Sequence, residues 1–344
     1  MRIMVHRSFY NYSTPVMWPF SIFRKSKKRL NSEDENNPEF AALYKKASEH
    51  NDPVAQLELS RCYHYGREVA KDEALSLKWH KLSAANGLAE SQYKMGWRYS
   101  SGTGVDIDYK ETVIWYRLAA EQGYADAQCD LGICYEIGRG VSQNYNEAVK
   151  LFFLSANNRC AMAQGKLGYF YQEGLGVIKD VKEAVKWYLM AANQGLAEAQ
   201  ITLDHCYSNG VGVVEDQAEA VKWCRKAAEQ GADMAQASLG MHYDEGKGVQ
   251  KDEVEAVKWF RKAAMQGNAM AQSMIGHFYI LGRGVPREMV EGYAYLNLSA
   301  VTYEVARQTL DSLEEEISTD QREDAQRRTR ELQSEIKANE SSPT

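Results

Sequence analysis

The sequence predicts an all-α protein, a solenoid of stacked helical hairpins. A unit of 36 residues recurs seven times between residues 52 and 303 without an insertion or a deletion, and a fixed period of about 20 to 50 residues is typical of solenoids and repeat arrays. Each unit holds two segments with apolar residues at helical spacing, and glycine ends most of them. A hairpin of this kind buries its apolar face only against its neighbours, so we expect the units to stack.

The 344 residues divide around this array. We predict a disordered basic tail and linker over 1–37, the repeat array over 38–303, capping helices over 304–338 and a disordered tail over 339–344. Within the array, a half-repeat covers the first full unit. The half-repeat spans 38–51, and the repeats span 52–87, 88–123, 124–159, 160–195, 196–231, 232–267 and 268–303.

The first helix of each repeat carries the pattern A-Q-x-x-L-G-x-x-Y. Gln occupies one position in all seven repeats, and Tyr follows it seven residues later. The helix stops at a Gly suited to the left-handed C-cap conformation, and a G-x-G-V loop follows in six repeats. The repeated glutamines are Gln56, Gln92, Gln128, Gln164, Gln200, Gln236 and Gln272.

The second helix begins with Asp or Asn in six repeats, and in five of them Glu follows three residues later. This is the spacing of a capping box, in which the first side chain accepts from backbone N–H groups and the Glu reaches back. The helix body, E-A-V-K-W-Y-R-K-A-A, places tryptophans on the buried side with the paired alanines. These are Trp79, Trp115, Trp187, Trp223 and Trp259.

Both ends of the array carry helix signals of their own. Asn37-Pro38 predicts an N-cap with proline at the first helical position, which starts the half-repeat helix. After the last repeat, two amphipathic segments predict the capping helices, and Ser318 with Gln321 predicts a capping box on the second of them. We expect the last residues, NESSPT, to be disordered.

These residues resemble the Sel-1-like repeat family, a relative of the tetratricopeptide repeats. The family unit has the pattern A-x-A-Q-x-x-L-G-x-x-Y-x-x-G-x-G-V-x-x-D-x-x-x-A-x-x-W-x-x-x-A-A-x-x-G, and the resemblance covers residues 52–303. It implies a right-handed α/α superhelix. It also implies a bacterial, non-enzymatic adaptor or scaffold for protein complexes.

Some cysteine-rich, secreted relatives pair the two helices by disulfides and carry a β-lactamase label, which makes a β-lactamase-like or penicillin-binding hydrolase the alternative. This chain lacks cysteines at those helix-end positions. Cys62, Cys134 and Cys206 recur two repeats apart, beyond the reach of a disulfide. Cys206 and Cys224 lie on paired helices, and a bond between them stays open. We expect reduced thiols in a cytoplasmic protein.

Charge and hydropathy narrow the kinds of partner. The net charge of −6 does not favour the binding of nucleic acid, which is itself negatively charged. No run of residues approaches the ~20 apolar residues of a membrane-spanning helix. Residues 16–29, VMWPFSIFRKSKKR, combine aromatic and basic side chains. The simplest expectation is a disordered tail; the alternative is peripheral contact with the inner membrane surface, which would make the protein a membrane-surface adaptor.

Three sequence patterns resemble a phosphate-binding loop, a catalytic triad and a metal site, but none of them meets the requirements of such a site. The G-x-G-V loops lack the residues of a phosphate-binding loop, and no strand precedes them. Asp204, His205 and Cys206 are consecutive on a helix and point about 100° apart, so they cannot form a catalytic triad. His205, Cys206, His242 and His277 lie on first helices of successive repeats, too far apart to share a metal. We predict no catalytic, cofactor or metal site.

The remaining candidate is a partner-binding surface on the first helices. By analogy with tetratricopeptide repeats, the residue five after the repeated Gln faces the concave side of the solenoid, where such proteins bind partners. Tyr93, one after its Gln, would add to an aromatic patch with Trp97 and Tyr169, residue types enriched at binding hot spots. The alternative is that these residues only pack between helices. The predicted site for a protein or peptide comprises Arg61, Tyr93, Trp97, Ile133, Tyr169, His205, Met241 and His277.

Overall fold

The computed structural model describes residues 37–313 and 315–341 as α-helices joined by short loops, without a strand among them. The predictions for residues 1–36, including the membrane contact of 16–29, and for residues 342–344 lie outside the described residues. Within the described ranges, no helix has both the length and the apolar content needed to cross a bilayer. The chain divides into two compact units, one ending at Asn86 and the other starting at Gly87.

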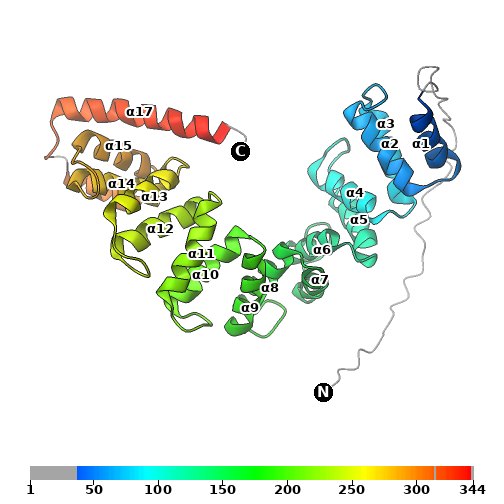
Figure 1. Cartoon of the computed structure of the whole chain (residues 1–344), viewed down its shortest axis with the longest axis horizontal. Coiled ribbons are helices and arrows are strands. Elements are labelled where there is room, and N and C mark those ends of the chain that lie inside the picture. The colour runs from blue at the N-terminus through cyan, green and yellow to red at the C-terminus, as the bar shows by residue number, and fades with distance from the viewer. Residues whose placement is uncertain (1–36, 314, 342–344) are drawn as a thin grey trace. The chain divides into compact units, whose positions relative to one another are not determined.

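The first unit consists of α1 (Pro38–Glu49), α2 (Pro53–Tyr65) and α3 (Glu73–Ala85) (Figure 1). The Asn37 side chain accepts hydrogen bonds from the backbone N–H groups of Glu39 and Phe40, which confirms the predicted N-cap. Phe40 is fully buried and meets the Tyr63 ring edge-on at 6.2 Å. The half-repeat helix α1 thus covers the apolar face of the α2–α3 hairpin.

The second unit starts with six helical hairpins in a row, each followed by a short loop (Figure 1). The hairpins are α4 (Ala89–Ser101) with α5 (Tyr109–Glu121), α6 (Ala125–Ile137) with α7 (Tyr145–Asn157), α8 (Ala161–Glu173) with α9 (Val181–Asn193), α10 (Ala197–Asn209) with α11 (Gln217–Glu229), α12 (Asp233–Glu245) with α13 (Glu253–Ala264), and α14 (Ala269–Leu281) with α15 (Met289–Ser299). The predicted α-solenoid of tandem hairpins is confirmed.

The repeated Gln joins neighbouring repeats through both ends of its amide. In α10, Gln200 Nε2 donates to the Ala192 carbonyl at the end of α9, at 3.0 Å. Gln200 Oε1 accepts from Gln230 Nε2, just after α11, at 2.8 Å. The same pair of contacts recurs around Gln128, Gln164 and Gln236. Since both polar ends are used internally, the repeated Gln is a structural residue.

Replacing Gln200 by leucine should therefore destabilise the second unit by about 1–3 kcal/mol, because the buried Ala192 carbonyl would lose its donor and Gln230 would lose an acceptor. The measurement is the shift of the urea unfolding midpoint. Thr202→Ala, on the same helix, removes only a hydroxyl that bonds to the Glu198 carbonyl one turn away. A Gln200→Leu variant no less stable than Thr202→Ala would contradict the structural role of the repeated Gln.

The second helices begin as predicted, with one difference. The Asp216 carboxylate accepts from the Glu219 N–H at 3.0 Å, as a capping residue should. The Glu219 carboxylate, however, does not complete the predicted box. It pairs with Lys222, one turn further on, at 2.7 Å. The same exchange occurs in Glu147–Lys150, Glu183–Lys186 and Glu255–Lys258. A cation one turn away attracts the carboxylate more strongly than a neutral N–H group does.

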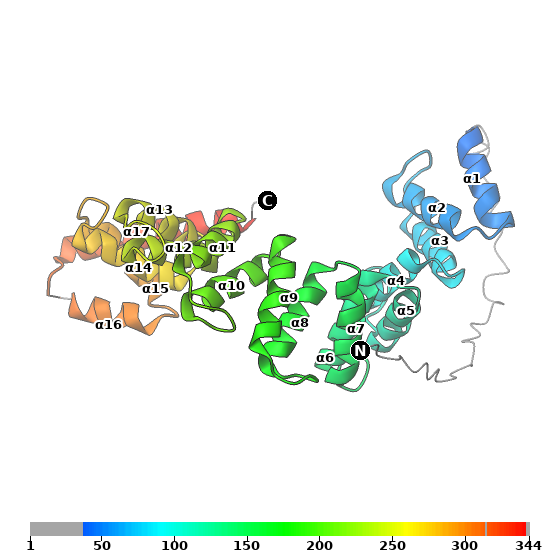
Figure 2. The same cartoon turned by 60° about the horizontal axis from the view of Figure 1, so that its bottom comes forward.

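Two helices follow the last hairpin: α16 (Glu304–Ser312) and α17 (Thr319–Ser341), the latter packed on α15 (Figures 1 and 2). Ser318 Oγ accepts from the Gln321 N–H at 3.2 Å, and Gln321 Oε1 accepts from the Ser318 N–H at 3.1 Å. The predicted capping box is confirmed. The helix extends past its predicted end at 338, to Ser341, and Asn339 Nδ2 lies 3.5 Å from the Met265 carbonyl oxygen. The predicted disordered tail thus began too early.

Candidate functional site

The exposed side of the first helices α4, α6 and α8 carries an apolar row. Trp97 is 49% exposed and Tyr169 is 43% exposed, and they occupy the same position of their repeats. Ile133, between them in the repeat order, is partly buried against the cluster around Phe152. We call the surface formed by Trp97, Ile133 and Tyr169 the first-helix face.

Consecutive first helices lie side by side at this face. Lys166 of α8 forms an ion pair with Glu136 of α6 at 2.8 Å, and the ring of Tyr93 on α4 lies 5.1 Å from that of Tyr124, the N-cap of α6. Tyr169 lies edge-on to the fully buried Phe170 ring, with centroids 6.2 Å apart. Trp97 and Tyr169 therefore project from a packed helical base.

Tyr93 is held differently from Trp97 and Tyr169. Its ring stacks on Tyr116 with centroids 5.6 Å apart and meets Tyr124 at 5.1 Å. Burial, together with the nearby Asp130 carboxylate, raises the pKa of Tyr93 well above its usual range. Burial also raises the pKa of Asp130. Tyr93 belongs to a packed aromatic cluster at the edge of the first-helix face.

The other predicted site residues lie in varied settings. His205 is exposed and its Nδ1 is 3.0 Å from Asn209 Nδ2, while His277 Nε2 is 3.2 Å from Thr309 Oγ1 of α16. Met241 is 36% exposed. Arg61 belongs to the first unit, where it pairs with Glu58 at 3.0 Å.

A buried polar cluster, which the sequence did not predict, joins α10, α11 and α12. Asp204, Cys224 and His242 each offer one ligand atom, and these atoms lie within 4.8 Å of one another. His242 Nε2 is 2.9 Å from Asp204 Oδ1, and the Cys224 thiol donates to the Ala235 carbonyl at 3.3 Å. The predicted exclusion of a metal considered His242 only with other first-helix residues, and so missed the thiol on α11.

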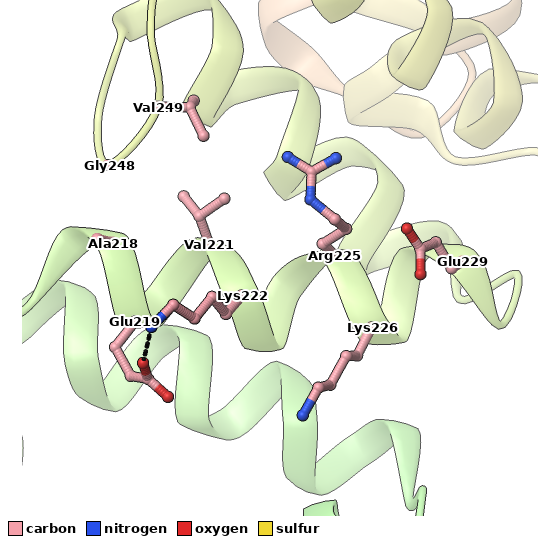
Figure 3. Close-up of a pocket in the computed structure, with 9 residues that line it drawn as sticks. All are labelled: Ala218, Glu219, Val221, Lys222, Arg225, Lys226, Glu229, Gly248 and Val249. Carbon is pink, nitrogen blue, oxygen red and sulfur yellow. Dashed lines mark hydrogen bonds and ion pairs between the residues drawn. The ribbon is translucent and has the colours of Figure 1, made fainter.

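A shallow pocket of about 470 Å³ lies between α11 and the loop that contains Gly248 and Val249 (Figure 3). Two charged side chains that line it already have partners. Lys222 pairs with Glu219 (dashed in Figure 3), and Arg225 donates to the Tyr243 hydroxyl at 2.8 Å. Most lining residues belong to the repeated E-A-V-K-W-Y-R-K-A-A pattern of α11 and to the G-x-G-V loop of the next repeat. The pocket is therefore a product of the repeat, and we do not assign it a ligand.

Comparison with known proteins identifies the family. The model of the Sel1 repeat matches seven times, over residues 53–88, 89–124, 125–159, 161–196, 197–231, 233–268 and 269–300. The chain belongs to the Sel1 repeat family. A Sel1 repeat protein from Oxalobacter formigenes shares 33% identity, with 83% of each chain covered and a TM-score of 0.67. The protective antigen c5321 of uropathogenic Escherichia coli, which has an SLR fold, shares 28% identity over 89% of this chain and 75% of its own, with a TM-score of 0.57. No curated protein matches.

Sel1 repeat proteins are generally protein-interaction scaffolds, and their fold is typically non-catalytic. In solenoids, side chains that the stacking does not use are available to distinguish partners. In this Sel1 repeat protein, Trp97 and Tyr169 are large side chains of the first helices that stay about half exposed.

The six cysteines of this Sel1 repeat protein are free thiols, so Cys206 and Cys224 are not bonded. Cys160 is the one that is partly exposed, at the N-cap of α8. The neighbouring Cys129 thiol, and then the Ala163 N–H, lower the pKa of Cys160 by favouring its thiolate. A helix N-terminus favours the thiolate in the same way.

Cys160 is therefore expected to be the thiol that iodoacetamide alkylates first. Because its pKa is lowered, it stays a thiolate as the pH falls, so its rate should change little between about pH 8 and pH 7, whereas the rate of an ordinary thiol falls nearly tenfold. Mass spectrometry of the folded protein after brief labelling gives the rate at each cysteine. Cys160→Ser should abolish the fast phase. Equal labelling of Cys160 and the buried cysteines would contradict this prediction.

Proposed function

We propose that this Sel1 repeat protein is an adaptor that binds a segment of a partner protein across the first-helix face. Trp97 and Tyr169 act as apolar anchors. The observation that supports it most strongly is the exposure of two large aromatic side chains, about half of each, at the same position of two repeats. Aromatic residues give large contact areas at low entropic cost and dominate binding hot spots.

The surroundings of the anchors suit a protein segment. Lys94 pairs with Glu90 at 2.6 Å beside Trp97, and Lys166 pairs with Glu136 near Tyr169. An apolar centre bordered by paired charges is the usual composition of a protein interface. The partner segment would offer two apolar side chains to the anchors and polar groups to this border.

The anchors are also held in place before binding. Both lie on helices whose other faces are buried, rather than on loops. Binding then costs little additional ordering of the adaptor, which favours affinity. The repeated Gln, Gly and Trp residues are required for stacking. The positions where the repeats differ therefore determine which partner binds.

The test compares two double variants as bait for partners from the native organism. Trp97→Ala with Tyr169→Ala removes the anchors. Ile178→Ala with Val214→Ala removes two side chains of loops, 89% and 87% exposed, and serves as the matched control. We expect the affinity for the specific partner to fall at least about tenfold for the first variant, because hot-spot truncations cost about 2 kcal/mol or more.

The control variant should bind like the wild type, and both variants should unfold at nearly the wild-type denaturant concentration, since exposed substitutions change stability by only about 0.5 kcal/mol. If the folded anchor variant keeps every specific partner at the control level, the proposed surface is wrong.

A further inference from the structure

The fifth repeat replaces an apolar contact by a polar pair. In four other repeats, a Gly on the first helix receives an aromatic ring from the second helix, with the position of a Gly Cβ less than 3 Å from the ring. These pairs are Gly96–Tyr116, Gly132–Phe152, Gly168–Tyr188 and Gly240–Phe260. In α10 and α11, the same two positions hold Asp204 and Cys224. A larger residue on one helix is thus matched by a smaller one on the other, and an apolar contact becomes a polar one.

A variable position of the next repeat completes the cluster. His242 of α12 stands in a column that holds cysteine in three other repeats and phenylalanine in two, Cys62, Cys134, Cys206, Phe170 and Phe278. It directs its ring at Asp204, 38 residues away in the sequence. Asp204, Cys224 and His242 are all buried. Two departures from the repeat pattern, Asp204 and Cys224, therefore meet a histidine from a variable position.

Both ring nitrogens of His242 face oxygen acceptors. Nδ1 is 3.1 Å from the Lys247 carbonyl oxygen, which only accepts, so this nitrogen carries a hydrogen. A neutral ring would then direct the Nε2 lone pair at the Asp204 carboxylate. A proton or a metal cation must lie between them for the contact to be attractive. A donor hydrogen bond from the second nitrogen to a backbone carbonyl is also the usual arrangement of a metal-bound histidine.

We infer that Asp204, Cys224 and His242 form a zinc(II) site that joins the fifth and sixth repeats. Thiolate sulfur, imidazole nitrogen and carboxylate oxygen are the ligands that zinc takes from proteins. The thiolate disfavours magnesium and calcium, which prefer oxygen ligands alone. About 10% of the Asp204 and His242 side chains is exposed, which leaves an edge for entry of the ion and for a water ligand.

A bound zinc ion would reverse which protonation state of the Cys224 thiol is favoured. Without a metal, burial, and then the Asp204 carboxylate, raise the pKa of Cys224, so its thiol keeps its proton. A divalent cation stabilises the thiolate. Binding therefore releases the Cys224 proton, and the Cys224 thiolate together with the Asp204 carboxylate balances the charge of the ion. Because the ligands come from α10, α11 and α12, the ion stabilises the stacking of these helices.

The test adds cobalt(II), as a probe for the zinc site, to the full chain after removal of metals with a chelator. We expect thiolate-to-cobalt charge-transfer absorption that saturates at one ion per chain and is displaced by zinc. Cys224→Ser should abolish the absorption. Cys206→Ser, which removes another buried thiol from α10, should retain it.

A second variant keeps the test decisive if Cys224→Ser fails to fold. Asp204→Gly with Cys224→Phe restores the Gly–aromatic pair seen at Gly240 and Phe260. It should fold, lose at least about 100-fold in zinc affinity, and show no rise of its unfolding temperature with zinc, unlike the wild type. Absence of charge transfer in the wild type, its persistence in Cys224→Ser, or unchanged zinc affinity in the paired variant would overturn the site.

Discussion

Replacing Phe260 by alanine is expected to destabilise the second unit by about 3–5 kcal/mol, because it leaves a large cavity in a close-packed interior. Phe260 is fully buried on α13. Its ring covers Gly240 of α12, and it meets the Phe278 ring of α14 at 5.5 Å. One side chain thus supports the contact within a hairpin and the contact between two repeats.

The measurement is urea unfolding followed by circular dichroism, with the wild-type chain in parallel. Val254→Ala is the matched control, since this side chain lies on the same helix and is 53% exposed. We expect its free energy of unfolding to stay within about 0.5 kcal/mol of the wild-type value. A loss below about 1 kcal/mol for Phe260→Ala would show that insertion of a ring against glycine does not hold the stack together.

Gly248→Ala should have the second-largest effect, about 2–4 kcal/mol, because strain in the backbone adds to a steric overlap. Gly248 has a φ of +70°, in the left-handed region. An added Cβ would lie 2.0 Å from the carbonyl oxygen of Gln217, at the start of α11. Since that oxygen belongs to the backbone, the loop or the helix would have to move.

Gly267→Ala separates the two causes. Gly267 also has a positive φ, +85°, but an added Cβ would meet no atom within 4 Å. This variant should lose only about 1 kcal/mol, the cost of the left-handed conformation. Urea midpoints of the two variants give the comparison. Equal losses would mean that the close approach of the G-x-G-V loop to the preceding repeat is not needed for stacking.

Local signals explain why the hairpins were predictable. A helix end depends on a few neighbouring residues, so Asn37, Ser318 and Asp216 identify their caps from the sequence alone. The extension of α17 was not predictable in this way. In this segment Asn339 contacts Met265, 74 residues earlier, and a contact of such range has no local signal in the sequence.

The candidate sites show the same limit. Repeat position alone suggested Trp97 and Tyr169, and both are exposed on the first helices. The packing of Tyr93 depends on rings from other helices. Cys224 was missed because its partners come from α10 and α12. The paired change from Gly and an aromatic residue to Asp204 and Cys224 was visible in the sequence, and comparison of repeats by column would have found it.

Site-specific photo-crosslinking tests the proposed binding face most directly. A photoreactive phenylalanine analogue would be placed singly at Trp97, Tyr169, Ile178 and Val214 in the full chain. Binding at the first-helix face predicts crosslinks to one common partner protein from positions 97 and 169, and none from the loop positions 178 and 214. Crosslinks to the specific partner from 178 or 214, with none from 97 and 169, would contradict it.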